Sequence, residues 1–143
     1  MYARQARAVR LALAAMTVAR QNLGRAAEDL VAARLEAHGW RIVERNARPS
    51  EVRGELDLIA VDWPALVFVE VKARLAGTVA GPERPAAAVG SRKRAQLRRL
   101  AAAWLRDRGY DVPRHRELRF DVVGLRLDAA GRVLEYEHLR AAF

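Results

Sequence analysis

Two apolar segments joined by only a few residues constrain the fold of this chain more than any other feature. The first is ELDLIAVD at residues 55–62 and the second is LVFVEVKAR at residues 66–74. Both have the β-branched and aromatic residues that are typical of buried strands. Because the connection through Trp63 and Pro64 is so short, we expect the two segments to pair as an antiparallel hairpin.

The second segment carries two charged residues among its apolar ones. Side chains alternate between the two faces of a strand, so Glu70 and Lys72 lie on the same face as Leu66 and Phe68. Such a pair can be a simple salt bridge at the end of a strand. It can also belong to a functional site, and this strand alone does not decide between the two interpretations.

The rest of the chain alternates between helical and strand patterns. Residues 24–38 are predicted to form a helix, and Glu28 borders its apolar stripe, which consists of Ala27, Leu30, Val31 and Leu35. Further strands are predicted at residues 40–46, 119–127 and 132–139, a helix capped by Ser91 at residues 91–108, and a loop at residues 75–90. This order predicts one α/β domain with a mixed sheet.

The hairpin places a second carboxylate beside Glu70. If Asp62 pairs with Ala65, opposite residue numbers add up to 127, and Asp57 then lies opposite Glu70. Like charges opposite each other destabilise a sheet, so the pair needs either a divalent cation or Lys72 and an arginine. With Glu28 nearby, a metal is the better account. The chain has no cysteine and its three histidines lack metal-ligand spacing, which favours Mg²⁺ or Mn²⁺ held by carboxylates over zinc.

Lysine is rare among the basic residues of this chain. It has 26 basic and 17 acidic residues, which gives a net charge of +9, yet Lys72 and Lys93 are its only lysines. An excess of this size indicates a polyanionic partner, most commonly nucleic acid. Lysine is a compact charge whose pKa responds to its surroundings, whereas arginine stays protonated. A lysine beside Glu70 therefore favours chemistry over a plain salt bridge.

The predicted helix at residues 91–108 carries seven cations and one acid. A charged face in solvent is the simplest interpretation, and contact with phosphates is the alternative. We predict contacts with nucleic acid, most simply DNA, from Arg48, Arg74, Arg92, Lys93, Arg94 and Arg98.

Residues 1–22 contain four arginines and no acid. Their apolar run is short and no convincing cleavage site follows it, so we expect a basic helical N-terminal extension rather than a secretory signal. No stretch approaches the roughly 18 apolar residues of a membrane span. We therefore expect a cytoplasmic protein that has no membrane partner.

The order Glu28, Asp57, Glu70-Val71-Lys72, with the last three on adjacent strands, resembles the PD-(D/E)XK nuclease superfamily, which includes archaeal Holliday junction resolvases. From about residue 24 onward, the chain is more closely similar to the YraN-like family of small uncharacterised bacterial proteins. The segments that carry this resemblance are HGWRIVERNAR, GELDLIAVD, LVFVEVKAR, Lys93 with its basic helix, RFDVVGL and EHLRAAF. The resemblance implies a single nuclease-like domain at residues 23–143, with a restriction-endonuclease-like core of five mixed strands flanked by helices.

The resemblance also implies a role for each residue of the site. Asp57 and Glu70 would bind Mg²⁺ together with the backbone carbonyl of Val71, and Glu28 would hold the metal or its waters. Lys72 would orient the attacking water or stabilise the charge that develops on the phosphate. The implied catalytic residues are therefore Glu28, Asp57, Glu70 and Lys72.

These roles predict a Mg²⁺- or Mn²⁺-dependent endonuclease that cleaves DNA, with branched or recombination intermediates as substrates and no small-molecule cofactor. Resolving a four-way junction requires two active sites, which a homodimer would supply. One alternative is a nucleic-acid-binding module that has the nuclease fold and does not cut, although opposed carboxylates repel phosphate. A weaker alternative is a structural partner in a DNA-processing complex, docked through residues 1–22. We interpret Asp121, a further strand carboxylate, as structural or as support for the site.

Overall fold

One mixed sheet organises the part of the chain that the computed structural model describes, residues 2–77 and 89–143. Its five strands follow the order β1-β2-β3-β4-β5. Strands β3 and β4 run parallel, and the other neighbours are antiparallel. The strands are β1 (Arg41–Ala47), β2 (Leu56–Asp62), β3 (Ala65–Leu75), β4 (Glu117–Leu127) and β5 (Val133–Leu139). The predicted fold, a five-stranded mixed sheet flanked by helices and consistent with a restriction-endonuclease-like core, is confirmed. Most of the loop predicted at residues 75–90 lies outside the described residues.

The hairpin of β2 and β3 has the predicted register. Its pairs run from Leu58–Val69 to Asp62–Ala65, and the residue numbers of each pair add up to 127. The paired residues end at Leu58–Val69, and extending this register by one step brings Asp57 to the position opposite Glu70, whose charge does act on Asp57. The two strands remain linked there, since the backbone N–H of Val71 donates a hydrogen bond of 2.9 Å to Oδ2 of Asp57.

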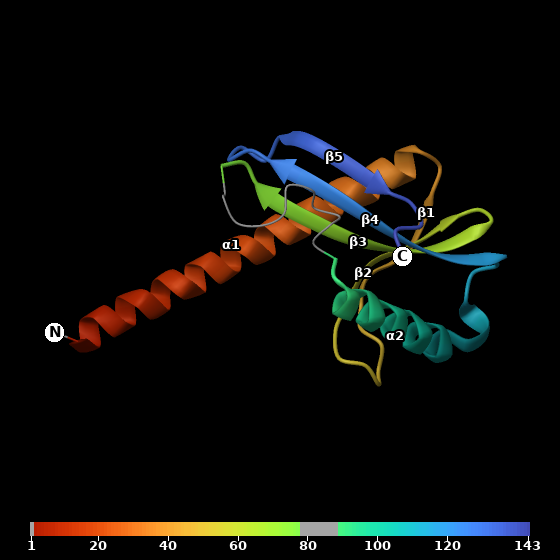
Figure 1. The fold of residues 1–143 in the computed structure, drawn as a ribbon, viewed down its shortest axis with the longest axis horizontal. Helices are drawn as coiled ribbons and strands as arrows, with labels where there is room; N and C mark the ends of the chain where they lie inside the picture. Colours follow the sequence, from red (N-terminus) through yellow and green to blue (C-terminus); the bar gives the residue numbers. More distant parts are fainter. Residues whose placement is uncertain (1, 78–88) are drawn as a thin grey trace.

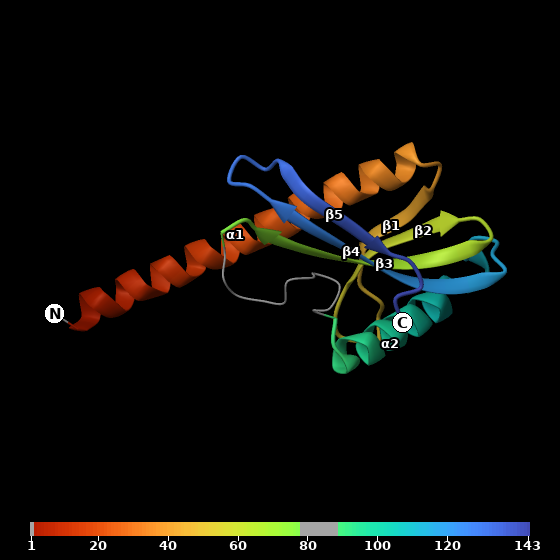
Figure 2. The ribbon, with the colours of Figure 1, turned by 45° about the horizontal axis from the view of Figure 1, so that its top comes forward.

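Two helices cover opposite faces of the sheet (Figures 1 and 2). Helix α1 (Tyr2–Ala37) packs Ala27, Val31 and Leu35 against apolar side chains of β2, β3 and β4. Helix α2 (Ser91–Arg108) lies between β3 and β4 in the sequence and packs on the other face; the short helix η2 (Gly109–Asp111) follows it. Each face therefore has its own apolar core.

Helix α1 is much longer than the predicted helix at residues 24–38. It begins at Tyr2 and runs without a break through Gly24. Figure 1 shows its N-terminal half extending away from the sheet, and residues 4–22 are exposed along their whole length. The division of the chain after residue 22 stays a prediction. Within the described residues, no helix has the length and apolarity needed to cross a membrane.

Two local predictions are wrong. Leu30 does not belong to the buried stripe of α1, because it is 38% exposed while Ala32 is buried in its place. Ser91 does not cap α2, since it is the first helical residue and Gly90 occupies the N-cap position without a side-chain hydrogen bond. The buried stripe of α1 differs from the prediction by two positions, and the start of α2 differs by one. Local sequence constrains the exact end of a helix only weakly.

The turn before β2 depends on a glycine that contacts α2. Gly54 has a φ of 131°, and a Cβ atom there would lie 2.7 Å from Nε2 of Gln96 and 3.2 Å from Cδ1 of Leu100. We expect Gly54→Ala to lower the free energy of unfolding by about 1–3 kcal/mol, through backbone strain and overpacking. Urea unfolding followed by circular dichroism measures this loss. The matched variant is Gly24→Ala. Gly24 lies inside α1 with open space around it, so this substitution should leave the stability unchanged or raise it. A neutral Gly54→Ala would contradict the tight packing of this turn.

Candidate active site

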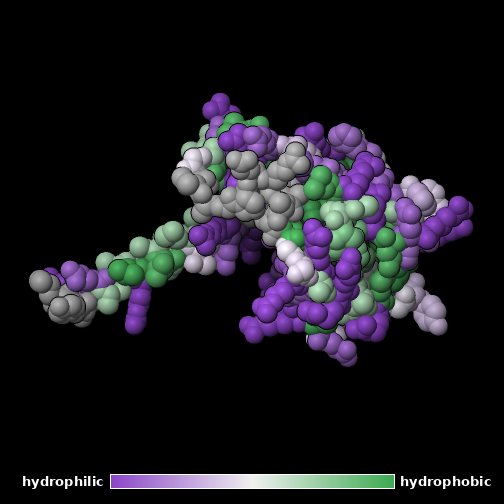
Figure 3. Space-filling view, in the orientation of Figure 1, coloured by the Kyte–Doolittle hydropathy of each residue, from purple (hydrophilic) through white to green (hydrophobic). Residues whose placement is uncertain are grey.

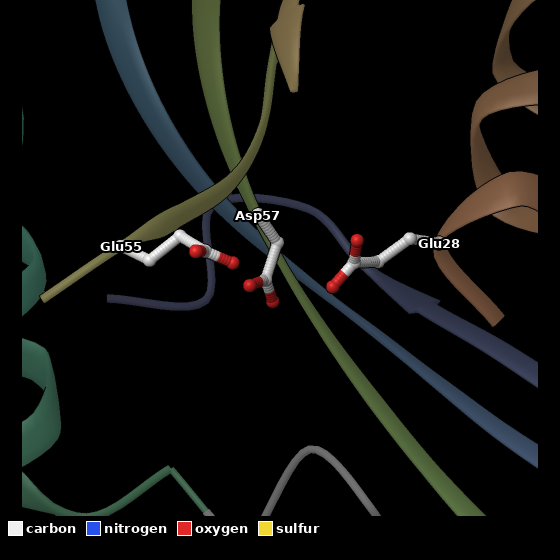
Figure 4. A group of neighbouring side chains, drawn as sticks. All are labelled: Glu28, Glu55 and Asp57. Atoms are coloured by element: carbon white, nitrogen blue, oxygen red, sulfur yellow. The ribbon is translucent and has the colours of Figure 1, made fainter. Parts of the chain in front are cut away.

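Three carboxylates meet where β2 begins beside α1. Glu28 comes from α1, Glu55 directly precedes β2 and Asp57 lies within β2. One oxygen of each carboxylate lies within 4.8 Å of the others, and Figure 4 shows the three groups pointing toward one another. Carboxylate oxygens are the ligands that Mg²⁺ and Mn²⁺ prefer. This acidic cluster of Glu28, Glu55 and Asp57 could therefore hold a metal ion.

Asn46 of β1 and Arg48, which follows the end of this strand, supply hydrogen-bond donors to the acidic cluster. The side-chain amide of Asn46 donates to Oε2 of Glu28 at 2.8 Å and to Oε1 of Glu55 at 2.9 Å. Nε of Arg48 donates to Oε2 of Glu55 at 3.0 Å. The backbone of Asn46 has a φ of 50°, in the left-handed region that asparagine tolerates better than most residues. These donors position the two glutamates and offset part of their charge.

Asp57 lies close to the carboxylates of both Glu70 and Glu28. Burial and the neighbouring Glu70 carboxylate raise the pKa of Asp57 to about 7, although the N–H of Val71 and the charge of Lys93 oppose this rise. Burial also raises the pKa of Glu28, against the hydrogen bond from Asn46. For both carboxylates, burial and neighbouring negative charge together outweigh the hydrogen bonds and cations that favour the charged form. A cation site has this electrostatic character.

Glu70 binds both lysines of the chain. Its Oε1 lies 3.1 Å from Nζ of Lys72 on β3 and 3.4 Å from Nζ of Lys93 on α2. Glu70 is only 4% exposed, and its Oε2 has no hydrogen-bond partner among the described residues. The salt bridge that the sequence allowed is therefore present. It is part of a larger group, because the only two lysines converge on one buried carboxylate beside Asp57.

The structure brings the predicted metal ligands together in part. Glu28 and Asp57 belong to the acidic cluster, whereas Glu70 lies outside this group of three, with its Oε1 held by the lysines. Glu70 and the carbonyl of Val71 as ligands stay predictions. Glu55 was missed, although it precedes Asp57 by two residues and strand periodicity puts both on one face.

Three of the predicted nucleic-acid contacts lie around the site. Arg48 is beside Glu55, with a side chain that is 79% exposed. Lys93 belongs to the Glu70 group. Arg74 is half-buried near the end of β3, two residues beyond Lys72. These side chains border the acidic cluster on the side of β1 and the Glu70 group on the side of β3 and α2.

The other predicted contacts lie on the first turns of α2, where Figure 3 shows hydrophilic side chains gathered on the surface. Arg92 and Arg98 are exposed. Arg94 is half-buried, and its Nε donates to the carbonyl of Val89 at 3.0 Å. The guanidinium groups of Arg94 and Arg98 lie 5.6 and 5.4 Å from the ring centroid of Phe143. These two arginines therefore also hold the C-terminus against α2.

Asp121 supports the fold from the other face of the sheet. It is fully buried, and it accepts hydrogen bonds from Arg119 at 2.9 and 3.0 Å, from Nε2 of His138 at 2.8 Å and from the N–H of Ala141 at 3.0 Å. Its neighbour Val122 pairs with Glu70 and packs on the α2 side. Because side chains alternate along β4, Asp121 points toward the α1 side, away from Glu70. The structural interpretation of Asp121 fits this position.

Comparison with known proteins agrees with the resemblance to the YraN-like family. The model of the uncharacterised protein family UPF0102, which is the YraN family, matches residues 27–125. A UPF0102 protein of Arthrobacter sp. (strain FB24) is 45% identical over 122 residues, which cover 85% of this chain and 96% of the relative. One of Moorella thermoacetica is 41% identical over 128 residues, 90% of this chain and 100% of the relative. One of Frankia casuarinae is 45% identical over 125 residues, 87% of this chain and 98% of the relative. The chain therefore belongs to the uncharacterised protein family UPF0102.

Proposed function

We propose that this protein is a metal-dependent endonuclease that hydrolyses phosphodiester bonds of DNA, with branched or recombination intermediates as its substrates. The observation that carries the proposal is the position of the acidic cluster directly beside Glu70 and its two lysines. A protein that only binds DNA has no need for buried carboxylates, because they repel phosphate. The resemblance to the PD-(D/E)XK superfamily supports the same conclusion and supplies the branched substrate.

Glu28, Glu55 and Asp57 would hold the ion, and the resemblance adds Glu70 and the carbonyl of Val71. The donor set fits Mg²⁺ or Mn²⁺, since all of its groups are oxygens and the cluster lacks a histidine. A bound ion of this kind polarises a phosphoryl oxygen and lowers the pKa of a water molecule that it binds. The protein's own contribution is to gather the carboxylates and keep their orientation, with Asn46 and Arg48 as hydrogen-bond donors.

The two lysines would bind the phosphodiester. Their side chains are 35% and 36% exposed, so each ammonium group is held by Glu70 and can still be reached from solvent. Lys72 and Lys93 would place positive charge beside the phosphate oxygens where negative charge develops in the transition state. Exposed arginines of α2, such as Arg92 and Arg98, would bind the DNA backbone without reading its sequence.

Metal binding gives a prediction that does not depend on DNA. Glu55→Gln should weaken Mn²⁺ binding at least about tenfold, because it removes one charged ligand while keeping the size of the side chain. Isothermal titration calorimetry of the protein with MnCl₂ measures this change. Glu36→Gln is the matched control, since Glu36 is an exposed glutamate of the same α1 helix. Equal affinities for Glu55→Gln and wild type would exclude Glu55 as a ligand.

The proposed function is tested by cleavage of a labelled four-way junction and of a linear duplex with the same arm sequences. Each reaction contains Mg²⁺, Mn²⁺ or EDTA, and wild type is compared with Lys72→Ala and Glu36→Ala. We expect cleavage only with a metal, loss of cleavage in Lys72→Ala, and full activity in Glu36→Ala. The ratio of junction to duplex cleavage identifies the substrate class, and sedimentation of the junction complex tests for two protein copies.

Binding without cleavage under any metal would contradict the nuclease proposal. The protein would then be a nucleic-acid-binding module on this fold, and Glu70 would serve as the partner of a structural ion pair. Cleavage that persists in EDTA would contradict the role of the acidic cluster.

A further inference from the structure

A polar pocket lies near the C-terminal end of α1, between this helix and β5. Its volume is about 480 Å³, and its lining includes Arg34, His38, Trp40, Tyr136, His138 and Arg140. No lining residue is acidic, and none belongs to the acidic cluster or to the Glu70 group. This cationic pocket is therefore distinct from the candidate active site.

Aromatic rings hold the two arginines of the cationic pocket in place. The guanidinium group of Arg34 lies 4.0 Å from the ring centroid of Tyr136, and that of Arg140 lies 5.6 Å from the ring centroid of Trp40. Nη1 of Arg140 lies 3.7 Å from the carboxylate of Asp62, which is a loose contact at a side chain that is 61% exposed. Both guanidinium groups thus keep hydrogen-bond donors for a ligand.

Each histidine of the cationic pocket already uses one ring nitrogen within the protein. Nδ1 of His38 lies 2.7 Å from the carbonyl oxygen of Arg34, and Nε2 of His138 lies 2.8 Å from Oδ2 of Asp121. Because both partners are acceptors, these nitrogens carry the protons. Asp121 also binds Arg119, so its charge is shared with a cation that is not part of the lining. The rings are fixed in orientation before any ligand arrives, which lowers the entropic cost of binding.

The polar groups of the cationic pocket are not all satisfied by the chain itself. The hydroxyl of Tyr136 is buried and has no hydrogen-bond partner among the described residues. Burial raises the pKa of Tyr136, against the charge of Arg34, so the group remains a neutral donor at physiological pH. A buried hydroxyl without a partner is uncommon in folded proteins and requires an explanation.

The composition of the lining selects an anion. Without a carboxylate, the pocket offers no negative charge to an amine or to a hard cation such as Mg²⁺. Two arginines within one cavity suit the tetrahedral oxygens of a phosphate, which arginine binds through paired N–H groups. The volume is in the range of pockets that hold a small organic ligand, so a phosphate that carries a nucleoside also fits. We propose that the cationic pocket binds a phosphate group, supplied either by a nucleic-acid strand or by a free nucleotide.

Calorimetric titration with three probes tests this proposal. The probes are a 5′-phosphorylated thymidine hexanucleotide, thymidine monophosphate and inorganic phosphate, each in EDTA so that cleavage does not interfere. Wild type is compared with the double variant Arg34→Ala/Arg140→Ala, which removes two exposed side chains. We expect wild type to bind at least one probe and the double variant to bind that probe at least about tenfold more weakly.

The matched control is Arg114→Ala/Arg116→Ala. It also removes two exposed arginines that lie over aromatic rings, here the ring of Trp63, and it should bind as wild type does. Binding of the hexanucleotide alone identifies a strand as the source of the phosphate, and binding of the monophosphate or of inorganic phosphate identifies a small ligand. Failure of wild type to bind any probe, or equal affinity of wild type and the Arg34→Ala/Arg140→Ala variant, would overturn the proposal. Because no metal or cleavage enters the measurement, the catalytic part of the proposed function is tested separately, by the cleavage assay.

Discussion

A Glu70→Gln variant is expected to lose at least about a hundredfold in metal-dependent cleavage of DNA while it binds the same DNA at least as tightly as wild type. The two effects have different causes. Cleavage falls because the neutral amide no longer fixes the ammonium groups of Lys72 and Lys93, which approach Oε1 of Glu70 at 3.1 and 3.4 Å. Binding is maintained or improves because one negative charge is removed from a surface that meets phosphates.

Single-turnover cleavage of the preferred substrate in Mg²⁺ measures the first effect, and fluorescence anisotropy of the same DNA in EDTA measures the second. Glu36→Gln serves as the control, because it removes an equal charge from an exposed position on α1. If Glu70→Gln cleaves as fast as wild type, Glu70 only stabilises the fold. If it binds DNA much more weakly than wild type, the two lysines need the carboxylate for binding itself, and the assigned separation of roles is wrong.

Lys72→Arg distinguishes positive charge from the particular shape of lysine. Arginine keeps the charge and pairs well with Glu70, but its planar group is larger and cannot occupy the same position as a compact ammonium. We expect this variant to bind DNA like wild type and to lose at least about tenfold in cleavage. The same two assays measure both quantities. Full activity would show that any cation suffices at this position.

Much of the sheet could be predicted because each strand has a local run of β-branched and aromatic residues. The short connection between β2 and β3 fixes their register, and the register then places Asp57 opposite Glu70 without further information. The N-terminal half of α1 is different. It contacts no core, so its length depends on helix propensity alone, and an apolar stripe could indicate only the part that packs on the sheet.

The candidate site was predictable where its residues share a strand or a hairpin, and less so elsewhere. Lys93 reaches Glu70 from α2, which follows β3 after a long connection, so no sequence spacing reports that contact. Asn46 is a partner of Glu28 and Glu55 only because β1, α1 and β2 come together in three dimensions. Glu55 could have been predicted, since residues two positions apart in an extended segment lie on the same face and Glu55 precedes Asp57 by two.

Asp121→Ala is expected to lower the free energy of unfolding by about 3–5 kcal/mol, because it leaves buried cationic and polar partners without their acceptor. The carboxylate is fully buried and accepts hydrogen bonds from Arg119, His138 and the N–H of Ala141. Arg119 also binds Asp62 at 2.9 Å, so the loss extends toward the β2–β3 connection. Urea unfolding of wild type and variant measures the difference, and Asp121→Asn provides a milder second variant if the alanine variant does not fold.

An exposed ion pair gives the matched control for this loss. Asp29 pairs with Arg45 through side chains that are 67% and 39% exposed, and such pairs contribute little to stability. Asp29→Ala should therefore cost much less than Asp121→Ala. Equal losses would show that burial of the Asp121 network contributes nothing particular to stability.

The same network predicts how stability depends on pH. Burial disfavours the charged form of Asp121, but the hydrogen bonds from His138 and Arg119 outweigh this and lower the pKa of Asp121 below its ordinary value. A carboxylate with a depressed pKa in the folded state stabilises the fold above its unfolded pKa of about 4, and this contribution disappears as the pH falls through the folded pKa. The difference in unfolding free energy between wild type and Asp121→Asn should therefore shrink as the pH falls below about 4. Urea unfolding of both proteins across this range measures the difference, which cancels the effect of carboxylates that the two proteins share. A difference that stays constant down to pH 2 would show that the charge of Asp121 is not what holds β4, β5 and the C-terminal residues together.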